Sequence, residues 1–163
     1  MRPVDPAALI TAALHTVEPA AQAKGISLVR SIAADVGPLR GDPSRLEQVV
    51  WNLVNNAVKF TPAGGRIEVK LSATEAGAQI VVADNGQGIA PDLLPHLFDR
   101  FRQGDATAAR AGGLGIGLAI VKHLIEMHGG TVTAESPGAV SYTHLRAHET
   151  DSYLVCRLLL EKP

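Results

Sequence analysis

Apolar residues recur at helical spacing in three parts of the chain. The longest such stripe lies within 42–61, where Asp42 is a favourable N-cap and Pro43 is a favourable first helical residue. A further helix is predicted over 117–128, before a pair of glycines. The first helix is predicted within 4–25, and its apolar residues fall three or four positions apart: Leu9, Ile10, Ala13, Leu14 and Val17.

Short apolar or alternating runs predict strands between and after these helices. They cover 26–32, 66–73, 78–85 and 131–136, and the second and third are joined by a turn at 74–77. A loop containing Pro and Gly follows the first strand, and a long loop-rich stretch follows the third. This order predicts an α+β two-layer sandwich in which helices cover one face of a mixed or antiparallel sheet.

The composition narrows the class of protein. The chain has 163 residues, of which 46% are hydrophobic and 19% charged, and this predicts one globular domain. A net charge of -1 and an aromatic content of 4% argue against a nucleic-acid partner. The single cysteine, Cys156, suits a reducing compartment. No apolar run reaches the roughly 18 residues of a membrane span, so we expect a cytoplasmic fragment without membrane contact. Whether a longer parent protein is membrane-anchored is left open.

Three polar residues stand out on the longest predicted helix. Asn52, Asn56 and Lys59 fall at i, i+4 and i+7, which places them on one helical face. Asparagine is a mediocre helix former, so two of them within an apolar helix need a reason. They either form a solvated stripe opposite the core or belong to a binding site.

Two glycine-rich stretches favour the binding site. Asp84 ends an apolar run, and Gly86 and Gly88 follow it at alternate positions. Glycine lets the backbone approach a flat ligand closely, although an ordinary Asp-Asn-Gly turn would have the same sequence. The second stretch leads directly into the last predicted helix, where backbone N–H groups and the helix N-terminus can hold phosphate, at Gly113, Gly115 and Gly117.

Together these groups predict a nucleotide site. Asp84 would take the base, and the second glycine-rich stretch would take the phosphates. Asn56 offers a neutral side-chain oxygen to a hard cation such as Mg²⁺, which usually keeps waters and also binds phosphates. Lys59 would neutralise a phosphate.

Four motifs in this order resemble the catalytic ATP-binding domain of bacterial sensor histidine kinases, within the GHKL superfamily. "LEQVVWNLVNNAVKF" resembles the family's N box, "DNGQGI" its first glycine box, "LFDRF" its phenylalanine box and "GGLGIGLAIVKHLIEMHGG" its second glycine box. The match runs from Leu46 to Gly130 and reaches weakly back to Val4. The resemblance implies a Bergerat-type ATP-binding fold, with a mixed sheet covered on one face by helices.

The resemblance implies roles for the residues around the adenine base. Asp84 would accept a hydrogen bond from the exocyclic amine of adenine, because an ionised carboxylate only accepts. Gly86 and Gly88 would let the backbone approach the base, and Ile89 would pack against its face. Phe60 stands where the family often has an aromatic residue.

The resemblance also implies the residues around the phosphates of ATP. Asn56 would coordinate Mg²⁺, Asn52 would face the phosphates or the metal's water shell, and Lys59 would touch phosphate. The ATP lid would span about 94–114. The remaining implied ATP contacts come from the second glycine box: Gly113, Leu114, Gly115, Ile116, Gly117 and Leu118.

Asn52 distinguishes between branches of this superfamily. The ATP-hydrolysing branches, and the anti-sigma-factor serine kinases, carry at this position a glutamate that acts as general base. An asparagine cannot take a proton, and a site without a base for water suits transfer to a histidine. The resemblance therefore implies a protein histidine kinase that transfers the γ-phosphoryl group of Mg-ATP to a histidine of a two-component sensor kinase. Its catalytic residues would be Asn52, Asn56 and Lys59.

We expect the chain to be a catalytic fragment that is inactive by itself. None of its six histidines has the sequence context of the family's phosphoaccepting histidine. The expected partner is a histidine phosphoacceptor and dimerisation domain, from the same parent protein or in trans, and a response regulator takes part indirectly. The alternative is a nucleotide-binding regulatory module, a pseudokinase, without transfer activity.

The C-terminal part departs from the family pattern. The kinase domain is expected over 1–138, of which 1–24 includes the link from the missing dimerisation helices. Residues 139–163 form an atypical tail that resembles a translated sequencing-adapter read-through found in gene predictions from environmental DNA, although "SYLVCRLLL" still fits a last strand. Four residues of this tail could be read as a metal site, but nothing else supports that reading: His144, His148, Glu149 and Asp151.

Overall fold

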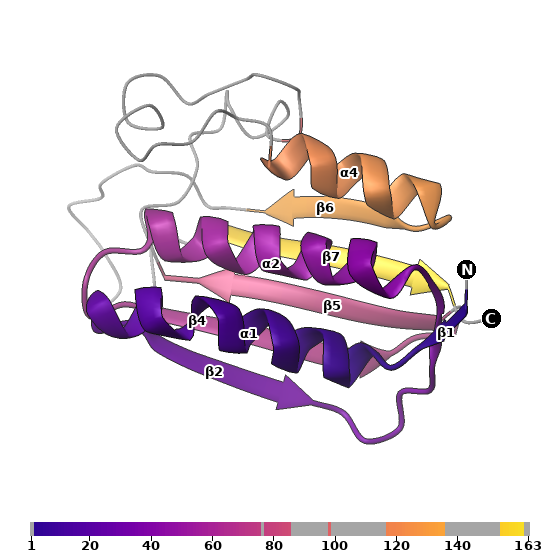
Figure 1. Cartoon of the computed structure of the whole chain (residues 1–163), viewed down its shortest axis with the longest axis horizontal. Helices are drawn as coiled ribbons and strands as arrows, with labels where there is room; N and C mark the ends of the chain where they lie inside the picture. Colours follow the sequence, from indigo (N-terminus) through magenta and orange to yellow (C-terminus); the bar gives the residue numbers. More distant parts are fainter. Residues whose placement is uncertain (1, 76, 86–97, 99–116, 136–153, 162–163) are drawn as a thin grey trace, which may run out of the picture.

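The structure is a computed structural model that describes residues 2–75, 77–85, 98, 117–135 and 154–161 (Figure 1). Its helices are α1 (Pro6–Ala23), α2 (Pro43–Phe60) and α4 (Gly117–Met127). Its strands form a five-stranded sheet and a two-stranded ribbon: β2 (Ser27–Ile32), β4 (Arg66–Ala73), β5 (Gly77–Asp84), β7 (Leu154–Glu161) and β6 (Thr131–Glu135) in the sheet, and β1 (Arg2–Val4) with β3 (Leu39–Gly41) in the ribbon.

The five-stranded sheet is mixed, with the strand order β2-β4-β5-β7-β6. Strands β2 and β4 run parallel, with Ser27 opposite Arg66, and the other neighbouring pairs are antiparallel. Figure 1 shows α1, α2 and α4 together on one face of this sheet. This arrangement confirms the predicted α+β sandwich, and of the two predicted kinds of sheet, mixed or antiparallel, the sheet is mixed.

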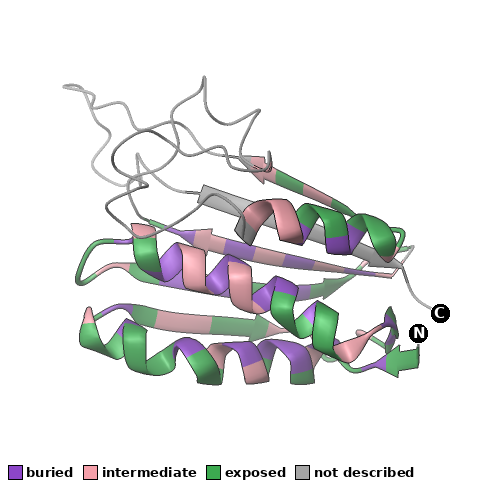
Figure 2. Ribbon diagram, turned by 45° about the horizontal axis from the view of Figure 1, so that its top comes forward, coloured by how far each residue is buried: buried purple, intermediate pink, exposed green. Residues whose placement is uncertain are grey.

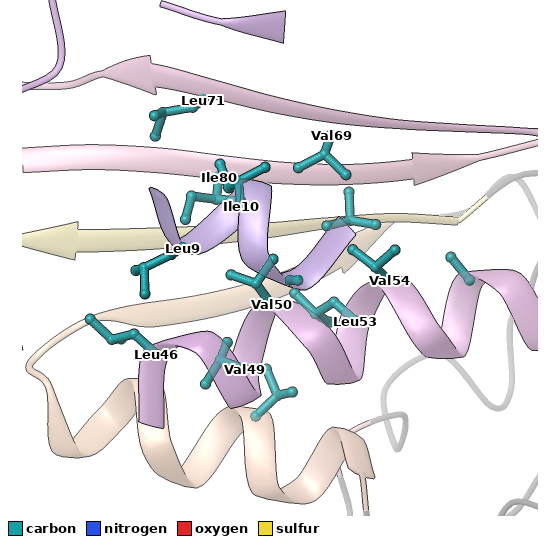
Figure 3. Packing of buried hydrophobic residues seen from close by; sticks show 14 of the residues in the cluster. Leu9, Ile10, Leu46, Val49, Val50, Leu53, Val54, Val69, Leu71 and Ile80 are labelled. Atoms are coloured by element: carbon teal, nitrogen blue, oxygen red, sulfur yellow. The ribbon is translucent and has the colours of Figure 1, made fainter. Parts of the chain in front are cut away.

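One hydrophobic core lies between the helices and the sheet. Figure 3 shows side chains of α1 and α2 meeting those of β4 and β5 in a single cluster. Because successive strand residues point to opposite faces, β5 buries alternate positions: Ala78, Ile80, Val82 and Asp84. Figure 2 shows buried and exposed segments alternating along α1 and α2, as expected for helices that cover a sheet with one side.

Helix α2 has the boundaries that its sequence predicts. The Asp42 side chain accepts hydrogen bonds from the backbone N–H groups of Ser44, at 3.0 Å, and Arg45, at 3.4 Å. Pro43 is the first helical residue, and the N–H of Thr61 closes the last turn on the carbonyl of Ala57. The helix buries one continuous stripe, which leaves its polar side for other contacts: Leu46, Val49, Val50, Leu53, Val54, Ala57 and Val58.

Three strands differ from the prediction or extend it. The ribbon of β1 and β3 was not predicted, because three-residue strands are too short to show a period of two. Strand β7, within the atypical tail, pairs with β5 on one side and β6 on the other, with Cys156 opposite Val82. The tail therefore supplies the last strand, as its pattern predicts. Over the described part of the chain, no helix has the length and apolarity needed to cross a membrane.

Candidate functional site

The polar side of α2 carries the residues that the sequence singled out. Asn52, Asn56 and Phe60 are half-buried, and Lys59 is exposed. These residues lie on the last two and a half turns of the helix, beside the buried stripe. The two asparagines are thus held at the edge of the core, and each is partly exposed.

Asn52 carries an unusual polar atom. Its side-chain Nδ2 is buried, and it finds no hydrogen-bond partner among the described residues. Buried polar atoms in folded proteins almost always have a partner, and leaving one without costs about 1–3 kcal/mol. A buried amide N–H group without a partner is suited to donate a hydrogen bond to an anionic oxygen of a ligand, or to a water molecule bound with that ligand.

Asp84 is the last residue of β5 and is only 7% exposed. It follows Ala78, Ile80 and Val82 at every second position, so its side chain lies on the face of the sheet that the helices cover. Its register partner on β4 is the fully buried Ile67. A carboxylate in this place sits between the two layers at an edge of the sandwich.

The end of α2 and the end of β5 lie at the same edge of the molecule. The chain leaves α2 at Phe60, turns through 61–65 and enters β4, and β5 returns antiparallel to β4. Because β5 therefore runs in the same direction as α2, Asp84 and the last turn of α2 meet at this edge. Figure 1 shows both ends on the left, and α4, which begins at Gly117, starts at its own left-hand end nearer the middle of the view.

Asn85 ties these ends together through the turn that follows α2. Its backbone N–H donates to the carbonyl of Arg66 at 3.2 Å, and its side-chain Oδ1 accepts from the N–H of Arg66 at 2.8 Å. The side chain thus continues the β4–β5 ladder by one position beyond Asp84. Sequence reasoning missed this role, although an asparagine directly after a strand is a typical place for side-chain-to-backbone bonds.

Only part of the predicted site lies within the described residues. Gly117 is the first residue of α4, and Leu118 is half-buried. The other glycine-box residues lie outside the described residues: Gly86, Gly88, Ile89, Gly113, Leu114, Gly115 and Ile116. So do most of the implied lid and the four tail residues considered as a metal site. Within the described ranges, no group of three His, Cys, Asp or Glu side chains is placed to hold a metal ion.

Comparison with protein families explains this arrangement. The family described as histidine kinase-, DNA gyrase B-, and HSP90-like ATPase matches residues 41–150. The chain belongs to this family. The match includes α2 with its asparagines, β5 with Asp84, and α4.

Individual relatives narrow the family. The sensor protein KdpD of Clostridium acetobutylicum is 41% identical over 110 residues, which is 67% of this chain and 12% of that protein. The sensor histidine kinase CusS of Escherichia coli strain K12 is 40% identical over 120 residues, which is 73% of this chain and 25% of that protein. The chain therefore spans a quarter or less of the length of these relatives.

Solved structures agree with the sequence relatives. The mycobacterial sensor histidine kinase MprB has a TM-score of 0.78 at 30% identity, over 99% of both chains. Full-length ShkA, solved in complex with AMPPNP, has a TM-score of 0.77 at 30% identity, over 96% of this chain and 30% of that one. The chain is thus a catalytic ATP-binding domain of the sensor histidine kinase type, which confirms the predicted family and fold.

Proposed function

We propose that this domain binds Mg-ATP and transfers its γ-phosphoryl group to a histidine of a two-component sensor kinase. The observation that carries the proposal is the edge at which the half-buried amides of α2 lie beside the buried carboxylate of Asp84. The AMPPNP complex of the related ShkA supports an adenine nucleotide as the ligand. Because ATP is an intracellular nucleotide, the proposal places the domain in the cytoplasm.

Each described residue of this edge takes one role. Asp84 accepts a hydrogen bond from the exocyclic amine of adenine, which selects adenine over guanine because guanine has a carbonyl at that position. The buried Nδ2 of Asn52 donates to a phosphate oxygen or to the water shell of the metal. Asn56 supplies its side-chain oxygen to Mg²⁺, and Lys59 places its ammonium group against phosphate. When bound, Mg²⁺ reduces the negative charge of the triphosphate.

The site fits transfer to histidine better than hydrolysis. Asn52 holds the position one turn before Asn56, and an amide cannot take a proton from water. A neutral imidazole needs no such base, because it is already a nucleophile. The acceptor histidine comes from a phosphoacceptor and dimerisation domain, in the same parent protein or in trans, and a response regulator takes the phosphoryl group later.

The domain boundary is also a proposal. We place the kinase domain at 1–138, with 1–24 including the link to the dimerisation helices, and treat 139–163 as an atypical tail. Within this tail, strand β7 lies between β5 and β6 and takes the place of a strand of the domain's sheet.

Binding is tested by replacing Asp84 with asparagine. The amide presents a donor to the donor of adenine, so Asp84→Asn loses a charge-assisted hydrogen bond of roughly 1.5–3 kcal/mol, which is about ten- to hundredfold in affinity. Calorimetry with ATP and Mg²⁺ measures the change, and circular dichroism checks the fold. Asp35→Asn is the matched control, because Asp35 is exposed in the loop after β2 and should bind ATP like the wild type. Unchanged affinity of Asp84→Asn would remove this carboxylate from the site.

Transfer is tested separately from binding. The purified chain is mixed with Mg-ATP and a separate phosphoacceptor domain of a related kinase, and acid-labile phosphate is measured on that domain. Its appearance supports the kinase function. Binding of ATP without any transfer to several such domains would favour the pseudokinase, and absence of ATP binding would overturn both.

A further inference from the structure

Lys24 lies at the end of α1, outside every motif of the sequence, and is bonded to the end of α2. Its half-buried side chain donates from Nζ to the carbonyl of Val58 at 2.8 Å and to the carbonyl of Lys59 at 3.3 Å. These carbonyls belong to the last turn of α2, whose carbonyl groups have no partner within the helix. Lys24 thus caps α2 from another helix.

The backbone around Lys24 holds the turn that follows α2. The carbonyl of Lys24 accepts from the N–H of Gly64 at 3.0 Å, and the N–H of Ser27 donates to the carbonyl of Gly65 at 2.9 Å. The last turn of α2 and the next residues are therefore fixed by the same short segment of chain. This last turn carries Lys59 and Phe60, and Asn56 lies one turn earlier.

The charge of Lys24 also matters at this place. The C-terminal end of a helix carries a partial negative charge of about half a unit, which repels phosphate. An ammonium group bonded to the terminal carbonyls offsets that charge.

We propose that Lys24 is a positioning residue of the nucleotide site, which fixes the last turn of α2 and offsets its negative end so that a triphosphate can bind beside it. The inference rests on the proposed function, because it assumes that Asn56 and Lys59 face phosphate. It assigns Lys24 no contact with the nucleotide.

The test compares a nucleotide with and without phosphates. Lys24→Met keeps the aliphatic stem but removes the charge and both hydrogen bonds, and Lys24→Arg restores a charged donor. Calorimetry of the full chain should show that Lys24→Met weakens Mg-ATP by roughly tenfold, the size of a helix-end charge interaction in a partly buried setting. Adenosine should change by less than about twofold, because it lacks the charge concerned. Lys24→Arg should recover most of the ATP affinity.

The control is Lys70→Met, because Lys70 is exposed in the middle of β4 and its contact is an ion pair with Glu68 at 3.7 Å. It should bind both ligands like the wild type. Equal loss of ATP and adenosine in Lys24→Met would make Lys24 a merely structural residue and overturn the inference, as would an unchanged ATP affinity.

If Lys24→Met does not fold, Lys24→Gln replaces it. This variant keeps a donor but no charge, so the inference requires it to bind Mg-ATP more weakly than Lys24→Arg. If the wild type binds adenosine or ATP and the Lys24 variants bind these ligands equally well, the proposed function is retained. Only the inference about Lys24 is then overturned. A wild type that binds neither ligand removes the proposed function, and the inference with it.

Discussion

Replacing Gly65 with alanine should disturb both halves of the candidate site at once. Gly65 is the residue before β4, in the turn between α2 and the sheet. A Cβ atom there would overlap Cγ2 of Thr61 and would lie 3.0 Å from the carbonyl oxygen of Pro62 and 3.1 Å from Oδ1 of Asn85. One of these neighbours ends α2, and another directly follows Asp84.

The overlap cannot be relieved cheaply. Thr61 is fully buried, and its β-branched side chain is stiff about its first torsion. The Pro62 oxygen is backbone, and Oδ1 of Asn85 is held by the N–H of Arg66. Forcing one extra carbon into such a place costs about 1–3 kcal/mol. For a domain of this size, that corresponds to a decrease in Tm of roughly 2–12 °C.

Thermal unfolding followed by circular dichroism measures the loss, and two glycines serve as controls. Gly37→Ala meets no atom within 4 Å, so its stability should stay within about 0.5 kcal/mol of the wild type. The added Cβ of Gly64→Ala meets no atom within 4 Å either, but the φ of 81° at this position strains any residue other than glycine by about 1–2 kcal/mol. This control therefore measures backbone strain without steric overlap. If Gly65→Ala were as stable as Gly37→Ala, the packing of this turn would not hold the site. A stable Gly65→Ala variant that also bound Mg-ATP normally would refute the reasoning entirely.

Two further predictions concern a buried hydroxyl and a half-buried imidazole. Thr61→Val should raise stability by about 1–3 kcal/mol, because the fully buried hydroxyl of Thr61 finds no hydrogen-bond partner within the part of the chain that the structure describes; a lower Tm would show that the hydroxyl is bonded. His128 should be the neutral Nδ1–H tautomer, since Nε2 accepts from the N–H of Asp42 at 3.1 Å and Nδ1 lies 2.7 Å from the carbonyl of Leu124, which can only accept. Nitrogen-15 NMR of the imidazole reports the tautomer, and a dominant Nε2–H form would contradict this pairing.

The sequence predicts the large elements well because their signals are local. The cap at Asp42, the proline after it and a stripe repeating every three or four residues lie within one segment, and α2 forms with those boundaries. His128 caps its own helix, with Nδ1 at 2.7 Å from the carbonyl oxygen of Leu124. That it also reaches the N-cap of α2 was not predictable, because the two residues are 86 positions apart.

In the candidate site, too, the sequence predicts the groups with local signals and misses those that depend on long-range packing. The residue types at four positions indicate a binding site by their chemistry alone: Asn52, Asn56, Lys59 and Asp84. The groups that hold them in place do not, since a lysine at the end of one helix gives no sign that it will cap another. Lys24 is 34 positions from Val58, and their bond depends on how α1 packs beside α2.

The turn 61–65, together with Arg66 at the start of β4, is bonded to several of these supporting groups. It receives bonds from the end of α1 at Gly64, from the start of β2 at Gly65 and from the end of β5 at Arg66. Each bond links a different element to the same six residues, so the amides of α2 and the carboxylate of Asp84 are held relative to one another through this turn. We therefore expect the spacing between the base-binding and phosphate-binding ends of the proposed site to depend on the residues bonded to this turn, and substitutions of the candidate binding residues alone would miss them.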